Sequence, residues 1–148
     1  MIRAVPLREW PALLAAAGVA LVVEVGLRVT TLPRLARLLG APLRTDDGGD
    51  LMPPSTPARL GPSLTPATRR RLRAVRRVLR HWPFGDTCLR RALVSGHVLR
   101  RLRPVLRVGV AKVDGRIQAH AWLEIDGVSL DPAGAELYQT FESIGGAR

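Results

Sequence analysis

The sequence predicts an α+β fold, in which N-terminal helices are followed by a helix beginning near Cys88 and by a small antiparallel sheet. Apolar residues recur at helical spacing up to about Arg101, and after Pro104 apolar and polar residues alternate along three segments. Asp-Gly dipeptides separate these segments at 114–115 and 126–127, and such dipeptides favour two-residue hairpin turns.

The chain length and cysteine content limit the possible architectures. A chain of 148 residues fits one compact domain that buries a core without staples. Its single cysteine allows no intramolecular disulfide and no Cys-rich metal site, so we expect a cytoplasmic protein with no metal and no cofactor. Within the domain we distinguish an N-terminal helical segment (1–40), a Pro/Gly-rich linker or loop (41–64) and a core (65–148).

The first segment is expected to hold two helices. Pro11 suits the first turn of a helix that runs to about Thr30. A second, short helix is expected from Pro33 to Leu39, and Gly40 is suited to end it.

Residues 11–23 are apolar without a break, as in buried helices, signal peptides and membrane segments. Glu24 and Arg28 interrupt the run short of the roughly 20 apolar residues that a spanning helix needs, and no small-residue cleavage site follows. We therefore expect a buried or partly exposed helix. Arginines flank the run, so peripheral membrane contact through this helix is the second interpretation.

A strongly basic helix is expected after the linker. Thr65 caps it and Pro66 occupies its first position. One side carries apolar residues at helical spacing, and the other side is a row of arginines. The row comprises Arg69, Arg70, Arg73, Arg76, Arg77 and Arg80.

The charge balance indicates anionic partners. The chain has 23 Lys and Arg against 12 Asp and Glu, a net charge of +11. Most arginine rows are solvated faces, and only 4% of the residues are aromatic, which supplies a nucleic-acid stacking platform poorly. We expect no nucleic-acid partner, and a non-catalytic basic module that binds nucleic acid or peptide is the alternative function.

Cys88 lies at the predicted start of the next helix, which begins at Thr87 or Cys88. The first backbone N–H groups of a helix are unpaired, and with the helix dipole they stabilise a thiolate. A neighbouring imidazolium lowers the pKa of such a thiol further. Cys88 is therefore the candidate nucleophile, although a lone cysteine among Leu and Ala is more often a small packed residue.

The hairpin turns predict where a partner for Cys88 lies. With Asp126-Gly127 as a two-residue turn, Trp122 faces Asp131, so His120 and Asp131 share one side of the sheet as diagonal neighbours. The first turn places Gly109 opposite His120 and leaves space beside the imidazole. We infer that His120 acts as the base and that Asp131 orients it. Taken singly, either residue is also explained as an ordinary polar residue of a strand.

The opposite side of the sheet is predicted to be apolar and must be covered. We expect part of the helical N-terminal half to pack there, while the Cys88 helix approaches the other side or the end of the sheet. The apolar residues are Val108, Val110, Ile117, Ala119, Ala121, Leu123, Ile125, Val128 and Leu130.

Several segments resemble those of a known family. "TCLRRAL", "LRVGVAK", "AHAWLEIDG" and "LDP" are similar to the transglutaminase-like, papain-like cysteine peptidases of lasso-peptide biosynthesis, and "LPRLARLLG" is similar to that family's opening. The resemblance implies a Cys-His-Asp triad at Cys88, His120 and Asp131, which removes the leader from a precursor peptide through an acyl-enzyme. It also implies a separate leader-recognition protein and a lasso cyclase as partners.

Residues outside the triad are assigned to substrate or partner binding. Arg73 and Arg76 suit an acidic leader or the partner protein, and Trp122 lies two residues beyond His120. The connection "RRLRPVLRVGV" lacks the glycine usual in the family, which concerns loop geometry more than chemistry.

Overall fold

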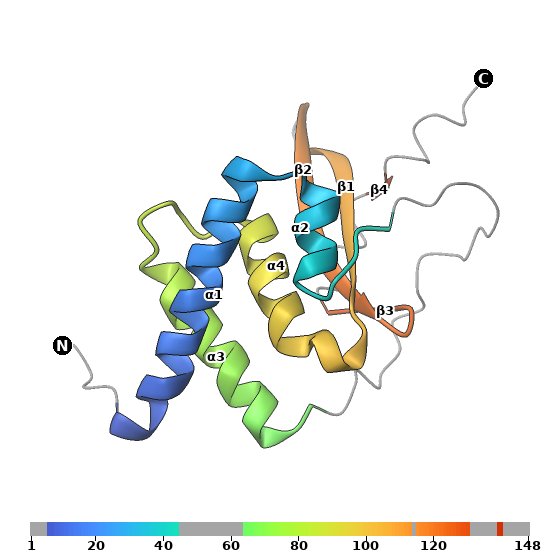
Figure 1. Cartoon of the computed structure of the whole chain (residues 1–148). Coiled ribbons are helices and arrows are strands. Elements are labelled where there is room, and N and C mark those ends of the chain that lie inside the picture. The colour runs from blue at the N-terminus through green and yellow to red at the C-terminus, as the bar shows by residue number, and fades with distance from the viewer. Residues whose placement is uncertain (1–5, 45–63, 114, 131–138, 141–148) are drawn as a thin grey trace.

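The computed structural model of the chain describes residues 6–44, 64–113, 115–130 and 139–140. Within them, helices and a small antiparallel sheet form the α+β fold that the sequence predicts (Figure 1). The helical elements are η1 (Leu7–Glu9), α1 (Trp10–Val29), α2 (Leu32–Leu38), α3 (Pro66–Arg80), α4 (Cys88–Leu99) and η2 (Arg100–Leu102). The strands are β1 (Val105–Val113), β2 (Arg116–Ile125), β3 (Val128–Ser129) and β4 (Gln139–Thr140).

Local signals set the helix boundaries. Thr65 precedes α3, and its side-chain oxygen accepts a hydrogen bond from the Thr68 N–H at 3.2 Å. Pro66 is the first residue of α3, as expected. The predicted start of α4 is confirmed too, although its end becomes a 3-10 turn, η2.

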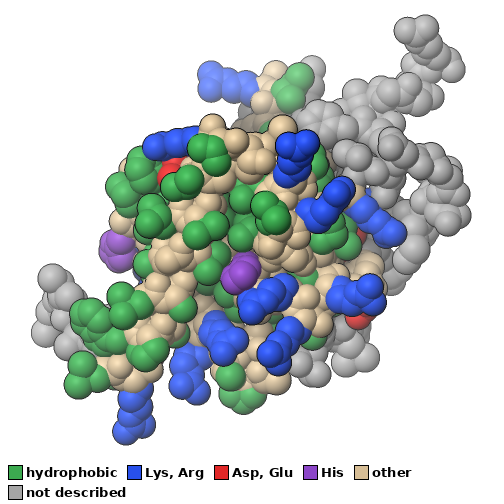
Figure 2. All heavy atoms as spheres, viewed as in Figure 1, with side chains coloured by type: hydrophobic (Ala, Val, Ile, Leu, Met, Phe, Trp, Pro, Cys, Tyr) green, Lys and Arg blue, Asp and Glu red, His purple; other side chains and the backbone are tan. Residues whose placement is uncertain are grey.

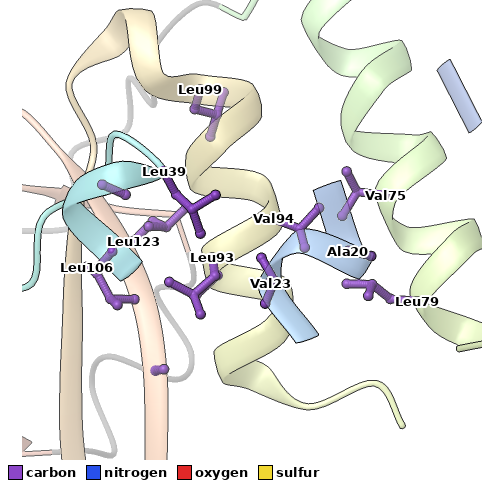
Figure 3. Close-up of a cluster of buried hydrophobic side chains, with 14 of the residues drawn as sticks. Ala20, Val23, Leu39, Val75, Leu79, Leu93, Val94, Leu99, Leu106 and Leu123 are labelled. Carbon is purple, nitrogen blue, oxygen red and sulfur yellow. The ribbon is translucent and has the colours of Figure 1, made fainter. Parts of the chain in front are cut away.

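Helix α4 lies in the middle of the fold, with α1 and α3 on one side and the sheet on the other (Figure 1). Two adjacent residues of α4 face these two layers (Figure 3). Val94 points toward Val23 and Val75, whereas Leu93 points toward the sheet, and both are completely buried. This double burial makes α4 the element around which the core is built.

The position of α4 corrects one expectation. A Cβ added at Gly96 would lie 2.7 Å from the Ala41 Cβ and 3.5 Å from Leu123 Cδ2, so α4 packs closely on the apolar side of the sheet. The Cys88 helix itself therefore covers the side that we assigned to the N-terminal half. The N-terminal half contributes Leu39 and Ala41 at its border. The physical reason is that α4 is apolar toward two layers, so it fits between them.

The sheet has the order β3-β2-β1-β4. Gly109 pairs with His120 and Ile125 pairs with Val128, so the predicted register is confirmed at both hairpins. The second turn works because Asp126 and Gly127 adopt φ angles of 51° and 76°, a left-handed conformation that these residue types accept. The short strand β4 pairs with β1 and was not predicted.

The start of the predicted linker is part of the fold. Leu43 forms a parallel bridge to Leu106 of β1. The Leu106 N–H donates to the Pro42 carbonyl at 3.0 Å, and the Arg44 N–H donates to the Leu106 carbonyl at 3.2 Å. Residues 41–44 thus lie along β1, and the remainder of the predicted linker up to residue 63 lies outside the described residues.

Candidate active site

Cys88 is the first residue of α4 and is half-buried. Thr87 caps the helix: its side-chain oxygen accepts a hydrogen bond from the Arg90 N–H at 3.3 Å. The thiol therefore sits at the helix end where unpaired N–H groups and the helix dipole favour an anion.

Cys88 and His120 line the same pocket, whose volume is about 220 Å³. The pocket lies where α3, α4 and the β2–β3 region of the sheet meet. Most of its wall is apolar, and Arg76 adds positive charge, whereas the charge of Arg91 is balanced by Asp86. The remaining lining residues are Leu64, Leu72, Ala92, Ser95, Leu99, Ala121, Trp122, Leu123 and Leu130.

The His120 ring is supported by its neighbours on the sheet. It stacks on the Trp122 ring, with a centroid separation of 6.0 Å and an interplanar angle of 18°. The Trp122 Nε1–H donates to Glu124 Oε1 at 3.2 Å, and Arg107 Nε donates to Glu124 Oε2 at 3.0 Å. Trp122, assigned to substrate or partner binding from the sequence, is buried and lines the same pocket as His120.

The other predicted site residues lie in different places. Asp131 lies outside the described residues, so its orienting role stays a prediction. The Leu130 N–H donates to the Leu123 carbonyl at 2.9 Å, which continues the predicted pairing up to the residue before Asp131. Arg76 lines the pocket, whereas Arg73 is exposed and is not among the residues that line it.

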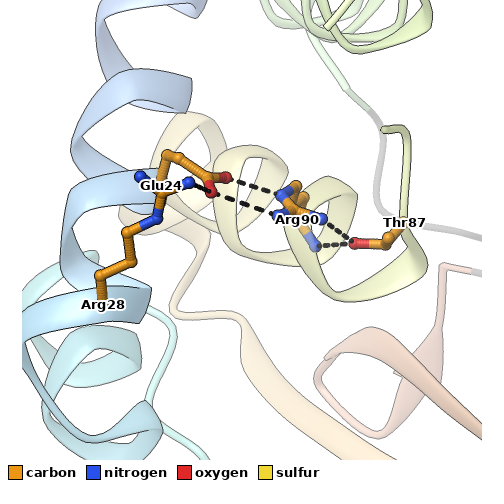
Figure 4. A network of polar contacts seen from close by, with 4 residues as sticks. All are labelled: Glu24, Arg28, Thr87 and Arg90. Carbon is orange, nitrogen blue, oxygen red and sulfur yellow. Dashed lines mark hydrogen bonds and ion pairs between the residues drawn. The ribbon is translucent and has the colours of Figure 1, made fainter. Parts of the chain in front are cut away.

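A buried carboxylate anchors the Cys88 helix to α1 (Figure 4). Glu24 accepts hydrogen bonds from Arg90 Nε at 2.8 Å, from Arg90 Nη2 at 3.3 Å and from Arg28 Nη2 at 3.1 Å. Arg90 also donates to the Thr87 side-chain oxygen at 3.4 Å. The Arg90 hydrogen bonds are the main cause that lowers the pKa of Glu24, so the carboxylate stays charged.

This anchor was missed in the sequence, where Glu24 served only as an interruption of the apolar run. The available signal was the interruption itself, because a charge inside an apolar helix requires a partner. Arg90 stands 66 positions away, so spacing alone does not identify it.

An arginine–carboxylate pair also holds the loop before α4. Arg91 donates to both carboxylate oxygens of Asp86, at 3.2 Å and 2.5 Å. Arg90 and Arg91 thus tie the first turn of α4 to two different neighbours, and the position of Cys88 is fixed from both sides.

A thiol at a helix start and an imidazole in one pocket are the groups that nucleophilic cysteine chemistry requires. A family model described as the transglutaminase-like superfamily matches residues 21–145, and the chain belongs to this superfamily. The superfamily includes cysteine peptidases and transglutaminases. No curated protein and no solved structure matches the chain.

Proposed function

We propose that the protein is a cysteine endopeptidase that removes the leader peptide from a lasso-peptide precursor. The observation that carries the proposal is that Cys88 and His120 line one pocket, with Cys88 at the start of α4. Membership of the transglutaminase-like superfamily supports the cysteine chemistry. The motif resemblance around Cys88 and His120 supports the leader peptide as the substrate.

The proposed reaction has two steps. The Cys88 thiolate attacks the carbonyl carbon of the leader–core amide, and backbone N–H groups at the start of α4 stabilise the oxyanion that forms. His120 gives its proton to the departing amine of the core peptide. A water molecule, deprotonated by His120, then hydrolyses the thioester, which frees the leader carboxylate and restores the thiol. Asp131 orients the imidazole throughout.

The residues of the pocket wall indicate which substrate groups the pocket can bind. Leu64, Leu72 and Leu130 suit apolar side chains, whereas Arg76 suits a carboxylate of the leader or of the recognition protein. The proposed partners are this separate recognition protein, which delivers the precursor, and a cyclase that acts on the released core.

Replacement of the nucleophile tests the proposal. The protein is incubated with its cognate precursor and recognition protein, and the products are identified by mass. We expect one cut at the leader–core junction, and a loss of roughly a thousandfold or more in rate for Cys88→Ala, because the covalent step disappears. Ser95→Ala is the matched control, since Ser95 lines the same pocket from the same helix.

Two results would contradict the peptidase. If a folded Cys88→Ala variant still cleaves the precursor, Cys88 is not the nucleophile. If the products carry an added amine, the enzyme catalyses acyl transfer in place of hydrolysis. Supplying a primary amine in the same assay separates these outcomes.

The alternative is a non-catalytic basic module, which the exposed arginines of α3 favour. It predicts an affinity for nucleic acid or acidic peptide that falls steeply with salt and does not change in Cys88→Ala. Absence of such binding eliminates it.

A further inference from the structure

The outward side of α1 is an apolar ridge. Within the described residues, Leu7–Val29 is the one helical stretch long and apolar enough to cross a membrane, a test that core helices and signal sequences also pass. The inner side of α1 is buried in the core at Ala16, Ala20 and Val23. Glu24, also on α1, accepts a hydrogen bond from Arg90 of α4. The large apolar residues on its outer side are each between 51% and 84% exposed. They are Leu7, Trp10, Leu14, Leu21, Val22, Val25 and Val29.

A basic hollow of about 400 Å³ borders this ridge. Small apolar residues of α1 line one wall, and four arginines surround it. Arg8 precedes α1, Arg70 and Arg71 belong to α3, and Arg100 follows α4. Within the part of the chain that the structure describes, Arg8, Arg70 and Arg71 form no ion pair.

The ridge and the hollow form one continuous surface. Pro11 and Ala15 are exposed and also line the hollow, so they connect the two. Figure 2 shows hydrophobic side chains along α1 with a group of Lys and Arg side chains beside them on the same face. The acidic residues of η1 and α1 are occupied: Glu9 pairs with Arg77, and Glu24 is buried.

We propose that this surface binds an anionic lipid bilayer. The ridge enters the boundary between headgroups and acyl chains, and the arginines around the hollow hold headgroup phosphates. An amphipathic helix that lies in the membrane plane needs such an apolar face with positive charge beside it. Trp10 suits the interface, because an indole is apolar with one polar end.

The shape of the surface favours a bilayer over a peptide. The ridge follows the exposed outer side of a helix about 30 Å long, whereas a peptide helix docks into a groove. The inner side of α1 remains packed on α3 and α4, so the protein lies on the membrane and does not cross it.

Co-sedimentation with vesicles tests the proposal on the full chain. We expect binding to equimolar phosphatidylcholine and phosphatidylglycerol vesicles, weaker binding as NaCl is added, and little binding to phosphatidylcholine alone. Arg70→Gln with Arg71→Gln should weaken binding roughly tenfold or more, because two phosphate contacts are lost. Leu14→Glu should also weaken it, since a charge would enter the apolar boundary.

The matched control is Arg73→Gln with Arg80→Gln. It removes the same charge from the same helix, but neither residue lines the hollow, so binding should be nearly unchanged. Equal losses in both double variants would show that net charge alone acts and would overturn the proposal. It is also overturned if the protein ignores anionic vesicles but binds a Glu-rich amphipathic peptide through Arg70 and Arg71. Thermal unfolding of each variant verifies that the fold is retained.

Discussion

Arg73 and Arg76 differ by three positions, yet they meet different surroundings. Both are exposed residues of α3, and the sequence assigns both to substrate or partner binding. Arg76 reaches the pocket that contains Cys88 and His120, whereas Arg73 is absent from its lining. The structure therefore assigns them unequal weight in any reaction at this pocket.

Charge reversal distinguishes the two arginines. Arg76→Glu should lower kcat/KM for precursor cleavage by roughly tenfold, because an acidic substrate or partner then meets a like charge at the pocket. Arg73→Glu should have a smaller effect, and neither change should alter Tm appreciably, since both side chains are exposed. Steady-state kinetics and thermal unfolding of both variants measure this. Equal losses would indicate a broad docking face in place of a pocket contact.

The sequence predicts the placement of Cys88 and His120 in the fold well, because the geometry there is local, and their catalytic roles stay predictions. The position of Cys88 follows from Thr87 as a cap, and the position of His120 opposite Gly109 follows from the Asp-Gly turns. Glu24 and Arg90 were missed because their pairing depends on how α1 packs on α4, which no local rule provides.

At the scale of elements, the close approach of α4 to the segment that follows α2 depends on one glycine. Gly96 lets α4 approach Ala41, since any Cβ at this position would meet the Ala41 Cβ at 2.7 Å, whereas Leu123 Cδ2 would lie at an ordinary 3.5 Å. Helix caps and hairpin turns are encoded within a few residues, so they were predicted. The side of the sheet that α4 covers depends on contacts between distant segments, so that expectation was wrong.

A methyl group at Gly96 tests this packing. Gly96→Ala should lower the free energy of unfolding by about 1–3 kcal/mol, because a close contact is overfilled. Ala41→Gly in the same chain should restore part of the loss by removing the opposing methyl group. Gly18→Ala is the control: nothing lies within 4 Å of its added Cβ, and the change should stabilise α1 by about 0.5–1 kcal/mol. Urea denaturation measures all three variants, and a stabilised Gly96→Ala protein would contradict the contact.

At the scale of the whole molecule, two titrating groups make stability depend on pH in the same direction. Burial, and then the positive charge of Arg100, lower the pKa of His97 from its ordinary 6.5. The pKa of Glu24 is lowered from 4.5, chiefly by the Arg90 hydrogen bonds. In both cases the unfolded chain binds the proton more readily than the folded protein does, so acid favours unfolding.

Acid titration of stability should therefore show two windows. The His97 contribution is complete above pH 6.5 and is lost as pH falls below that value, through the lowered pKa. The Glu24 contribution is complete above pH 4.5 and is lost below it in the same way. His97→Gln should remove the upper window. Glu24→Gln should remove the lower one and also destabilise the protein at neutral pH, because Arg28 and Arg90 lose their carboxylate.

Urea midpoints measured from neutral to acidic pH measure both effects. Glu9→Gln is the control for the carboxylate, since Glu9 pairs with Arg77 at the surface. A wild-type protein that becomes more stable as pH falls below 6.5 would contradict the prediction.

The outer edge of β1 is closed by two short segments, residues 42–44 beside Leu106 and β4 beside Gly109 and Val110. A bare strand edge is a template on which another chain can assemble. Residues 42–44 precede β1 in the chain and β4 follows it. During synthesis, the part of the edge that β4 covers is therefore unpaired until β4 has been made. A chain cut before Gln139 would leave the edge bare at Gly109 and Val110, while residues 42–44 would still cover Leu106. We expect such truncated chains to associate through the bared backbone groups.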